Sequence, residues 1–263
     1  MNRVDRGRVR ASFSRGAAGY DGRAATQRTV QERVLALAAE TAPAARRVLD
    51  VGAGTGALLA RLRAARPGLA AAAIDVAPGM CAAARAALPG ALVARADAEA
   101  LPFRPGAFDL VLSTSTFQWL ARPGPALAEV RRVLSPGGTL CLALFGARTL
   151  HELRDAWRAS ASGAARERIH HFLGRDDLVA ALGAAGLLPR AVFEEELIER
   201  HPDARAVLRS LKAVGASSAV PGPRGLGGRA ATLEALRLYE SRHGGPSGVP
   251  ATFHVIYAVA GAP

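Results

Sequence analysis

The stretch Leu49-Asp50-Val51-Gly52-Ala53-Gly54-Thr55-Gly56 decides the fold of this chain of 263 residues. A short apolar run enters three glycines at alternate positions, and residues 58–65 then follow a helical pattern. Glycine permits a sharp turn from strand to helix and lets a ligand approach the backbone. The first N–H groups of the helix can bind a carboxylate or a phosphate. The stretch therefore predicts a ligand-binding loop behind a buried strand.

The glycine loop alone leaves the ligand open. Gly52, Gly54 and Ala57 also satisfy the dinucleotide pattern G-x-G-x-x-G/A, so an NAD-binding enzyme is one interpretation and a turn without a ligand is another. Asp75 ends the next predicted strand, and a carboxylate there can accept hydrogen bonds from both hydroxyls of a ribose. This feature is typical of NAD and S-adenosylmethionine sites alike.

Strand and helix patterns alternate outward from the loop. Apolar runs predict strands at 47–52, 71–75, 91–94, 108–113 and 139–145. Apolar residues at helical spacing predict helices at 26–40, 58–65, 78–88 and 126–134. Such alternation implies right-handed crossovers and a parallel sheet. Beyond residue 148 we expect helices at 151–159, 175–185, 204–214 and 232–242, and strands at 190–199 and 252–260.

The predicted fold is α/β, with a mostly parallel seven-stranded sheet, an antiparallel C-terminal edge strand and a helical lid. We divide the chain into an N-terminal arm and lid helix (1–45), a ligand-binding core (46–147) and a helical acceptor-side region with the last two strands (148–263). Residues 1–20 are expected to be loosely structured. Residues 222–228, rich in Gly and Pro, predict a flexible link, and His170-His171 predicts a loop doublet without a third ligand.

Composition narrows the possible partners and compartment. The net charge of +12 predicts either a solvated basic surface or attraction to an acidic partner, and no aromatic-rich basic patch supports nucleic acid binding. Cys81 and Cys141 are the only cysteines, so neither a disulfide framework nor a metal-ligand spacing exists. No apolar run reaches membrane-spanning length. We expect a cytoplasmic protein with no membrane segment and no metal, and leave the oligomeric state open.

Three later motifs favour one cofactor. Residues 97–103 (Asp-Ala-Glu-Ala-Leu-Pro-Phe), 108–113 and 134–140, with a Pro-Gly-Gly turn, follow the loop in order. This ordered set resembles the class I, Rossmann-like S-adenosylmethionine-dependent methyltransferases. The resemblance implies that the three glycines line the methionine moiety, that Asp75 holds the ribose and that Asp97 faces the adenine amino group. The full implied cofactor set is Asp50, Gly52, Ala53, Gly54, Gly56, Asp75, Met80, Asp97, Ala98 and Ser113.

The flanking segments resemble one family over nearly the whole chain. Residues 13–21, 117–119 (Phe-Gln-Trp), 150–157, 209–216 and 250–253 are similar to segments of the malonyl-[acyl-carrier protein] O-methyltransferases of biotin synthesis. The segment Leu211-Lys212 to Gly215-Ala216 discriminates best among methyltransferases. The chain departs from the family at Thr114, where asparagine is common, and at 217–218 and 221–229.

The family resemblance implies methyl transfer to the free carboxylate of a malonyl group on acyl-carrier protein. Carboxyl groups are ionised at neutral pH, so no general base is needed. Candidates to position the acceptor are Tyr20, Gln118, Trp119 and Lys212. For three of them a structural role is the alternative: a surface aromatic for Tyr20, core packing for Trp119 and a solvated helix position for Lys212. An acidic carrier protein would suit the basic charge.

Other functions stay open at this point. A methyltransferase for a free acid such as trans-aconitate shares the Gln-Trp feature. An NAD-binding oxidoreductase shares the glycine loop, although dehydrogenases do not usually carry the three later motifs. A cofactor-binding protein without catalysis is the fourth possibility.

Overall fold

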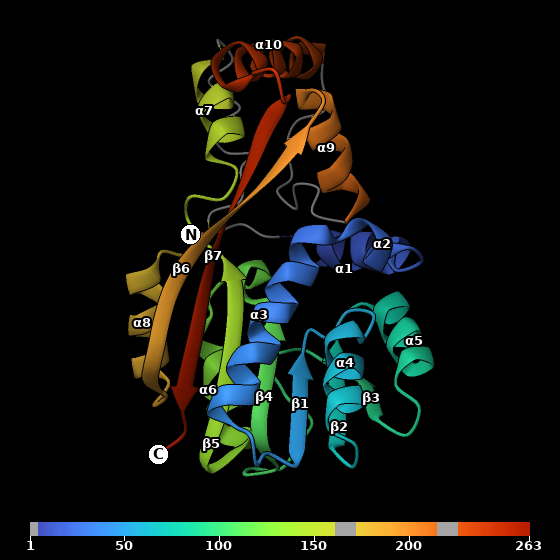
Figure 1. Cartoon of the computed structure of the whole chain (residues 1–263), viewed down its shortest axis with the longest axis vertical. Helices are drawn as coiled ribbons and strands as arrows, with labels where there is room; N and C mark the ends of the chain where they lie inside the picture. The colour runs from blue at the N-terminus through green and yellow to red at the C-terminus, as the bar shows by residue number, and fades with distance from the viewer. Residues whose placement is uncertain (1–4, 161–171, 215–225) are drawn as a thin grey trace.

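The computed structural model describes residues 5–160, 172–214 and 226–263. Among these, seven strands form one sheet in the order β3-β2-β1-β4-β5-β7-β6 (Figure 1). The strands are β1 (Arg47–Val51), β2 (Ala70–Asp75), β3 (Leu92–Arg95), β4 (Phe108–Thr114), β5 (Leu134–Phe145), β6 (Leu188–His201) and β7 (Val249–Gly261). Each predicted strand is present, and β5, β6 and β7 are longer than predicted.

The mostly parallel sheet with an antiparallel C-terminal strand is confirmed. That strand, β7, is antiparallel to both of its neighbours and lies between β5 and β6 rather than at the predicted edge, so β6 is the outermost strand. Burial explains this order. β7 is buried along almost its whole length, as expected of a strand covered on both faces. β6 leaves Leu188 and Ile198 each 57% exposed, which an outer strand tolerates.

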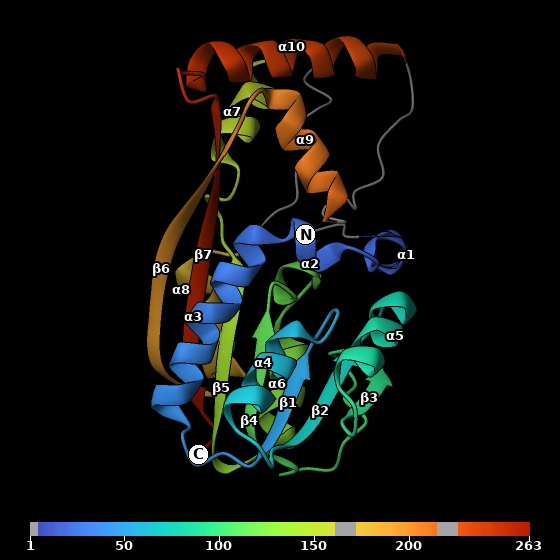
Figure 2. The same cartoon turned by 45° about the vertical axis from the view of Figure 1, so that its right-hand side comes forward.

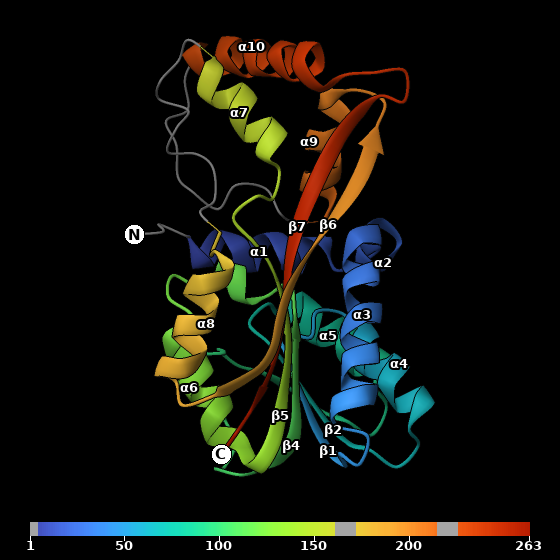
Figure 3. The ribbon, with the colours of Figure 1, turned by 60° about the vertical axis from the view of Figure 1, so that its left-hand side comes forward.

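Helices cover both faces of the sheet. α3 (Ala25–Thr41), α4 (Ala57–Ala65) and α5 (Pro78–Ala87) share one core with one face, and α6 (Gly124–Val133) and α8 (Arg175–Ala184) share a second core with the other. Figure 3 shows α6 and α8 across the sheet from α3 and α4. On α3, Val30, Val34 and Ala38 are fully buried at a spacing of four residues, which explains the helical pattern in the sequence.

The N-terminal segment differs from the prediction. Residues 1–20 were expected to be loosely structured, but Arg6–Gly16 forms α1 and Tyr20–Arg23 forms α2. The side chain of Asp5 caps α1 by accepting the backbone N–H of Arg8 at 3.0 Å. Only Val9 of α1 is buried, so the helix has almost no apolar stripe to recognise. Its contacts with α5 hold it in place, and contacts between such distant segments leave no local pattern in the sequence.

The C-terminal region forms a helical cap over the projecting ends of β6 and β7. The cap consists of α7 (His151–Ala159), α9 (Ala204–Ala213) and α10 (Leu226–His243), which surround these strand ends in Figures 1 and 2. The predicted helices at 151–159, 204–214 and 232–242 are confirmed, and α10 begins six residues earlier, inside the predicted 222–228 link. The rest of that link (222–225) and His170-His171 lie outside the described residues.

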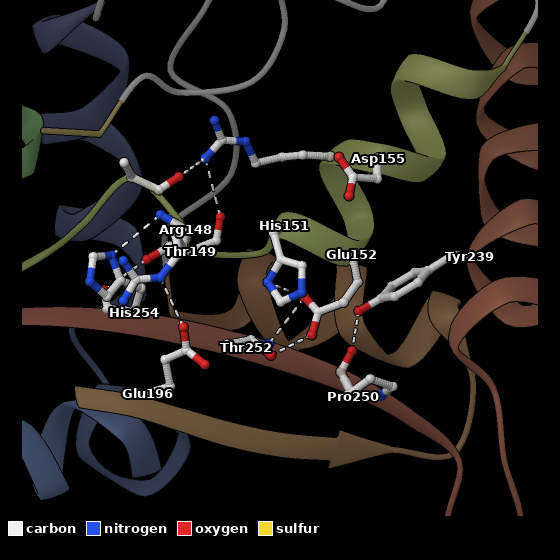
Figure 4. A network of polar contacts seen from close by, with 12 residues as sticks. Arg148, Thr149, His151, Glu152, Asp155, Glu196, Tyr239, Pro250, Thr252 and His254 are labelled. Carbon is white, nitrogen blue, oxygen red and sulfur yellow. Dashed lines mark hydrogen bonds and ion pairs between the residues drawn. The ribbon is translucent and has the colours of Figure 1, made fainter. Parts of the chain in front are cut away.

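A buried carboxylate joins the cap to the sheet. Glu152 of α7 accepts hydrogen bonds from the hydroxyl of Thr252 and, at 3.4 Å, from its backbone N–H (Figure 4). Glu152 and Thr252 are both 3% exposed. Tyr239 of α10 donates to the carbonyl oxygen of Pro250 on the same strand. Helices α7 and α10 of the cap are therefore anchored to the first residues of β7.

A second group of polar contacts fixes the chain just before α7. Thr149 donates to the carbonyl oxygen of His254 at 3.0 Å, and Arg148 pairs with Glu196 of β6 at 2.9 Å (Figure 4). His254 Nδ1 accepts the backbone N–H of Arg148 at 3.3 Å, so its Nε2–H donates to Glu194 at 2.8 Å. Burial lowers the pKa of His254, which favours this neutral form. Strands β6 and β7 and the cap thus form one connected unit.

No helix among the described residues is long and apolar enough to cross a membrane. Cys81 and Cys141 are free, buried thiols, consistent with the absence of a disulfide framework from the sequence.

Candidate active site

One pocket lies at the carboxyl ends of β1, β2 and β4, where open α/β sheets bind ligands. Helix α1 and the first residue of α2 form its roof. The lining residues come from these strand ends, from the turn after β3, from the first residues of α5, from η1 (Phe117–Trp119) and its flanking residues, and from the roof. They are Arg6, Val9, Arg10, Phe13, Tyr20, Gly52, Gly54, Ile74, Asp75, Val76, Ala77, Met80, Ala96, Asp97, Ala98, Thr114, Ser115, Thr116, Trp119 and Leu120.

The three glycines of the loop have different roles. All three have positive φ angles, 74°, 56° and 84° for Gly52, Gly54 and Gly56. A Cβ on Gly52 would overlap the side chain of Thr116, and one on Gly56 would lie 2.8 Å from Leu88 Cδ1. A Cβ on Gly54 would meet no protein atom within 4 Å. Packing therefore requires Gly52 and Gly56, whereas Gly54 leaves open space where a ligand can approach.

Two carboxylates lie behind and beside the loop. Asp75 accepts the backbone N–H of Gly54 at 3.0 Å and that of Ala77 at 2.8 Å, and burial raises its pKa against these hydrogen bonds. Asp50 is 1% exposed, and burial together with the nearby charge of Asp75 raises its pKa to about 8. Its Oδ2 has no hydrogen-bond partner in the described part of the chain. A positively charged ligand at the loop would therefore stabilise the ionised forms of both carboxyl groups.

Three contacts join the roof to the pocket walls. Arg6 of α1 pairs with Asp97 at 2.6 Å and with Glu99 at 3.1 Å. The hydroxyl oxygen of Ser14 accepts the backbone N–H of Gly79 at 2.8 Å, on the first turn of α5. A Cβ on Gly79 would overlap the backbone of Ser14, so only glycine allows this approach.

The third contact fixes α2 to the glycine loop. Thr55 donates to the Asp21 carboxylate at 2.7 Å. Our sequence prediction did not include Arg6, Ser14 or Thr55 among the site residues. The available signal was the position of Thr55, which lies inside the glycine loop and therefore beside the predicted ligand site.

Three aromatic side chains close one side of the pocket. Phe13 meets Tyr20 with ring centroids 6.3 Å apart and Trp119 at 5.7 Å, both edge to face. Burial raises the pKa of Tyr20, and the charges of Asp21 and Asp75 act in the same direction, so its hydroxyl is protonated. Phe13 lines the pocket but was not among the predicted site residues, although segment 13–21 was recognised as similar to the family.

The structure brings most of the predicted residues together. Tyr20, Gly52, Gly54, Asp75, Met80, Asp97, Ala98 and Trp119 all line the pocket. The other six lie outside the lining set: Asp50, Ala53, Gly56, Ser113, Gln118 and Lys212. Ser113 is fully buried and donates to the carbonyl oxygen of Val51 at 2.7 Å, which joins β4 to β1. Gln118 is 3% exposed, and Lys212 is an exposed residue of α9.

The titratable groups of the pocket limit the chemistry. Its lining contains no histidine, cysteine or lysine, and the described residues contain no cluster of three potential metal ligands. The two acids of the lining, Asp75 and Asp97, are held by backbone N–H groups and by Arg6. The arrangement suits a reaction that needs binding and alignment rather than a general base.

Comparison with solved structures identifies the fold. A methyltransferase structure from Bacillus halodurans superposes with a TM-score of 0.61 at 18% identity and covers 89% of this chain and 98% of that one. A methyltransferase in complex with the Trm112 activator of Haloferax volcanii gives 0.61 at 22% identity and covers 97% of both chains. Residues 49–142 match the methyltransferase domain family. The protein is a methyltransferase of the Rossmann-like class, and the NAD-oxidoreductase interpretation is set aside.

Sequence relatives define the family more closely. The malonyl-[acyl-carrier protein] O-methyltransferase of Geobacter sulfurreducens is 48% identical, over 97% of this chain and 98% of that protein. The protein of the same name from Halorhodospira halophila is 39% identical, over 97% and 87%. A biotin biosynthesis bifunctional protein of Cellvibrio japonicus is 36% identical over 97% of this chain and half of its own length. The chain belongs to the malonyl-[acyl-carrier protein] O-methyltransferase family.

Proposed function

We propose that the protein transfers a methyl group from S-adenosylmethionine to the free carboxylate of malonyl-acyl-carrier protein, as a step of biotin synthesis. The observation that carries the proposal is the extent of the relationship to the Geobacter protein, 98% of which is covered. The relationship includes the cap and roof as well as the loop. A partial match limited to 49–142 would support the cofactor alone.

The residues of the pocket fit S-adenosylmethionine. The open position at Gly54 leaves room for the ligand against the backbone, and a cationic amino acid end would stabilise the ionised forms of Asp50 and Asp75, whose pKa values burial raises. In this proposal Asp75 holds the ribose, and Asp97, Ala98 and Met80 surround the adenine. When bound, S-adenosylmethionine supplies an electrophilic methyl group on a sulfonium.

The acceptor needs orientation and a dry site. A malonyl carboxylate is ionised at neutral pH, so the chain does not have to remove a proton. Phe13, Tyr20 and Trp119 exclude water from the acceptor side, which matters because a hydrated carboxylate is a poor nucleophile. Gln118 and Lys212 stay candidates for orienting the acceptor. The metal-free mechanism, the carrier-protein partner and the cytoplasmic location remain parts of the proposal.

The direct test is methylation of malonyl-acyl-carrier protein. Purified protein is incubated with S-adenosylmethionine and the malonyl or the acetyl form of the carrier, and intact-protein mass spectrometry follows the carrier. We expect one added methyl on the malonyl form and none on the acetyl form, which lacks the free carboxylate. Methylation of trans-aconitate without methylation of malonyl-acyl-carrier protein would refute the proposed acceptor and favour the small-molecule alternative.

A further inference from the structure

Helix α9 has one apolar face and one cationic face. Val207 and Leu211 pack into the core of the cap and sheet, whereas Arg205, Arg209 and Lys212 are exposed. Their spacing of four and three residues places the three cations on one side of the helix. We call these three residues the α9 stripe.

The charge of the α9 stripe is poorly compensated. α9 contains no acidic residue. Among the described residues, the only carboxylate within 4.0 Å of a stripe cation is that of Asp203, 3.7 Å from Arg209, with the two side chains 46% and 69% exposed. Glu240 of α10 instead accepts the backbone N–H of Ala204. Since like charges four residues apart destabilise a helix, stability of α9 does not explain the stripe.

The α9 stripe ends beside the roof of the pocket. The backbone oxygen of Ala213 lies 3.9 Å from the position that a Cβ on Gly16 would take, so the last turn of α9 meets the end of α1. α9 also contacts α2, whose first residue, Tyr20, lines the pocket. Figure 2 shows α9 running from the cap down to α1 and α2. A partner bound along α9 would sit next to the junction of cap and roof.

We propose that the α9 stripe is the docking surface for an acidic surface helix of the carrier protein that presents the acceptor. The inference rests on the proposed function. Charge complementarity selects this occupant, because acyl-carrier proteins are acidic and the stripe offers three cations in a line, with Asp203 as their one acidic neighbour among the described residues. Attraction of this kind raises the encounter rate and is screened by salt. The docked carrier then places its prosthetic arm at the junction of α9 with α1 and α2.

Charge reversal on α9 tests the inference. We compare Arg209→Glu and the double variant Arg205→Glu/Arg209→Glu with the wild type. The matched control is Arg104→Glu, an exposed arginine ahead of β4, at the end of the sheet opposite the pocket. Fluorescence anisotropy with labelled malonyl-acyl-carrier protein gives Kd at low and high salt. We expect the double variant to bind about tenfold more weakly at low salt with a flatter salt dependence, and the control to bind as the wild type does.

Two further measurements separate the outcomes. Unchanged affinity for S-adenosylmethionine shows that a variant is folded. If a Glu variant does not fold, Arg205→Gln/Arg209→Gln takes its place. Suppose that the wild type methylates malonyl-acyl-carrier protein and the folded double variant binds the carrier as tightly as the wild type does. This result would overturn the docking surface and leave the proposed function intact. Wild-type protein that neither binds nor methylates the carrier would overturn both.

Discussion

Arg6, in the first helix of the chain, donates from Nη2 to both carboxylate oxygens of Asp97, at 2.6 Å and 2.7 Å. The pair joins α1 to the turn after β3 and closes the roof over one end of the pocket. By family resemblance, Asp97 faces the adenine amino group. The roof and the proposed adenine site therefore share one carboxylate, so we expect closure of α1 and cofactor binding to be coupled.

Replacing Arg6 by alanine should speed cofactor release with little loss of stability. Arg6 and Asp97 are 43% and 39% exposed, and an exposed pair contributes about 0.2–1 kcal/mol. If that energy holds the roof closed, cofactor affinity falls by up to about fivefold. Stopped-flow fluorescence gives the dissociation rate of S-adenosylmethionine. Arg8→Ala is the control, because among the described residues Arg8 has an ion pair only with its neighbour Asp5. Tighter binding by Arg6→Ala would mean that Arg6 competes with the adenine instead.

Alanine substitutions at Gly54 and at Gly52 should have different consequences. In Gly54→Ala the new methyl group has free space in the protein and adds only the strain of a positive φ, about 1–2 kcal/mol. The folded variant should lose most of its S-adenosylmethionine affinity, because the new methyl group occupies the ligand's space. Gly52→Ala adds an overlap with Thr116 and should lower the thermal midpoint further.

Calorimetric titration measures the S-adenosylmethionine affinity of Gly54→Ala and Gly52→Ala, and thermal unfolding measures their stability. Gly68→Ala is the matched control for backbone strain, because Gly68 also has a positive φ and open space but lies outside the pocket. Full cofactor affinity in Gly54→Ala would contradict the assignment of this position to the ligand.

Substituting Thr252 by valine should destabilise the attachment of the cap. Valine keeps the shape but removes the hydroxyl that donates to the buried Glu152. A buried acceptor that loses its partner costs about 1–3 kcal/mol. Urea unfolding measures the loss, and Thr29→Val on the exposed side of α3 should change stability by less than about 0.5 kcal/mol. Equal stability of the two variants would show that water replaces the hydroxyl.

Most of the sheet was predictable from local pattern, because each core strand is an apolar run and each crossover helix has periodic apolar residues. The position of β7 was less accessible. Its continuous apolar run from Val255 to Ala260 is typical of a strand covered on both faces, whereas the four glutamates of β6 are typical of an outer strand. Strand order depends on such a comparison between distant segments. α1 was missed because its helix depends on Asp5 and on tertiary contacts rather than on an apolar stripe.

The site was predictable where a motif fixes the backbone. The glycine loop and Asp75 line the pocket because they end adjacent parallel strands. Arg6 was not predictable, since its contact with Asp97 spans 91 residues and neither residue's neighbours indicate it. Ser113 and Gly56 resemble ligand residues in sequence but serve packing between elements, which only the three-dimensional contacts reveal.

The buried Asp50 should make both stability and cofactor binding depend on pH. Its folded pKa of about 8 lies above the value of about 3.9 in an unfolded chain. Between these values the folded protein binds the additional proton, so the free energy of unfolding decreases as pH rises from about 4 to 8. Asp50→Asn cannot titrate and should flatten this slope, leaving the contribution of Asp75, whose pKa is raised in the same direction.

A cationic cofactor favours ionised Asp50, so binding should release a proton. Wild-type affinity for S-adenosylmethionine should therefore increase as pH rises toward about 8, and the affinity of Asp50→Asn should vary less and be lower at high pH. Urea unfolding and calorimetric titration at a series of pH values measure the two effects, with the exposed Asp155→Asn as control. An unchanged slope in Asp50→Asn would assign the titration to another group, because no proton can then bind at position 50.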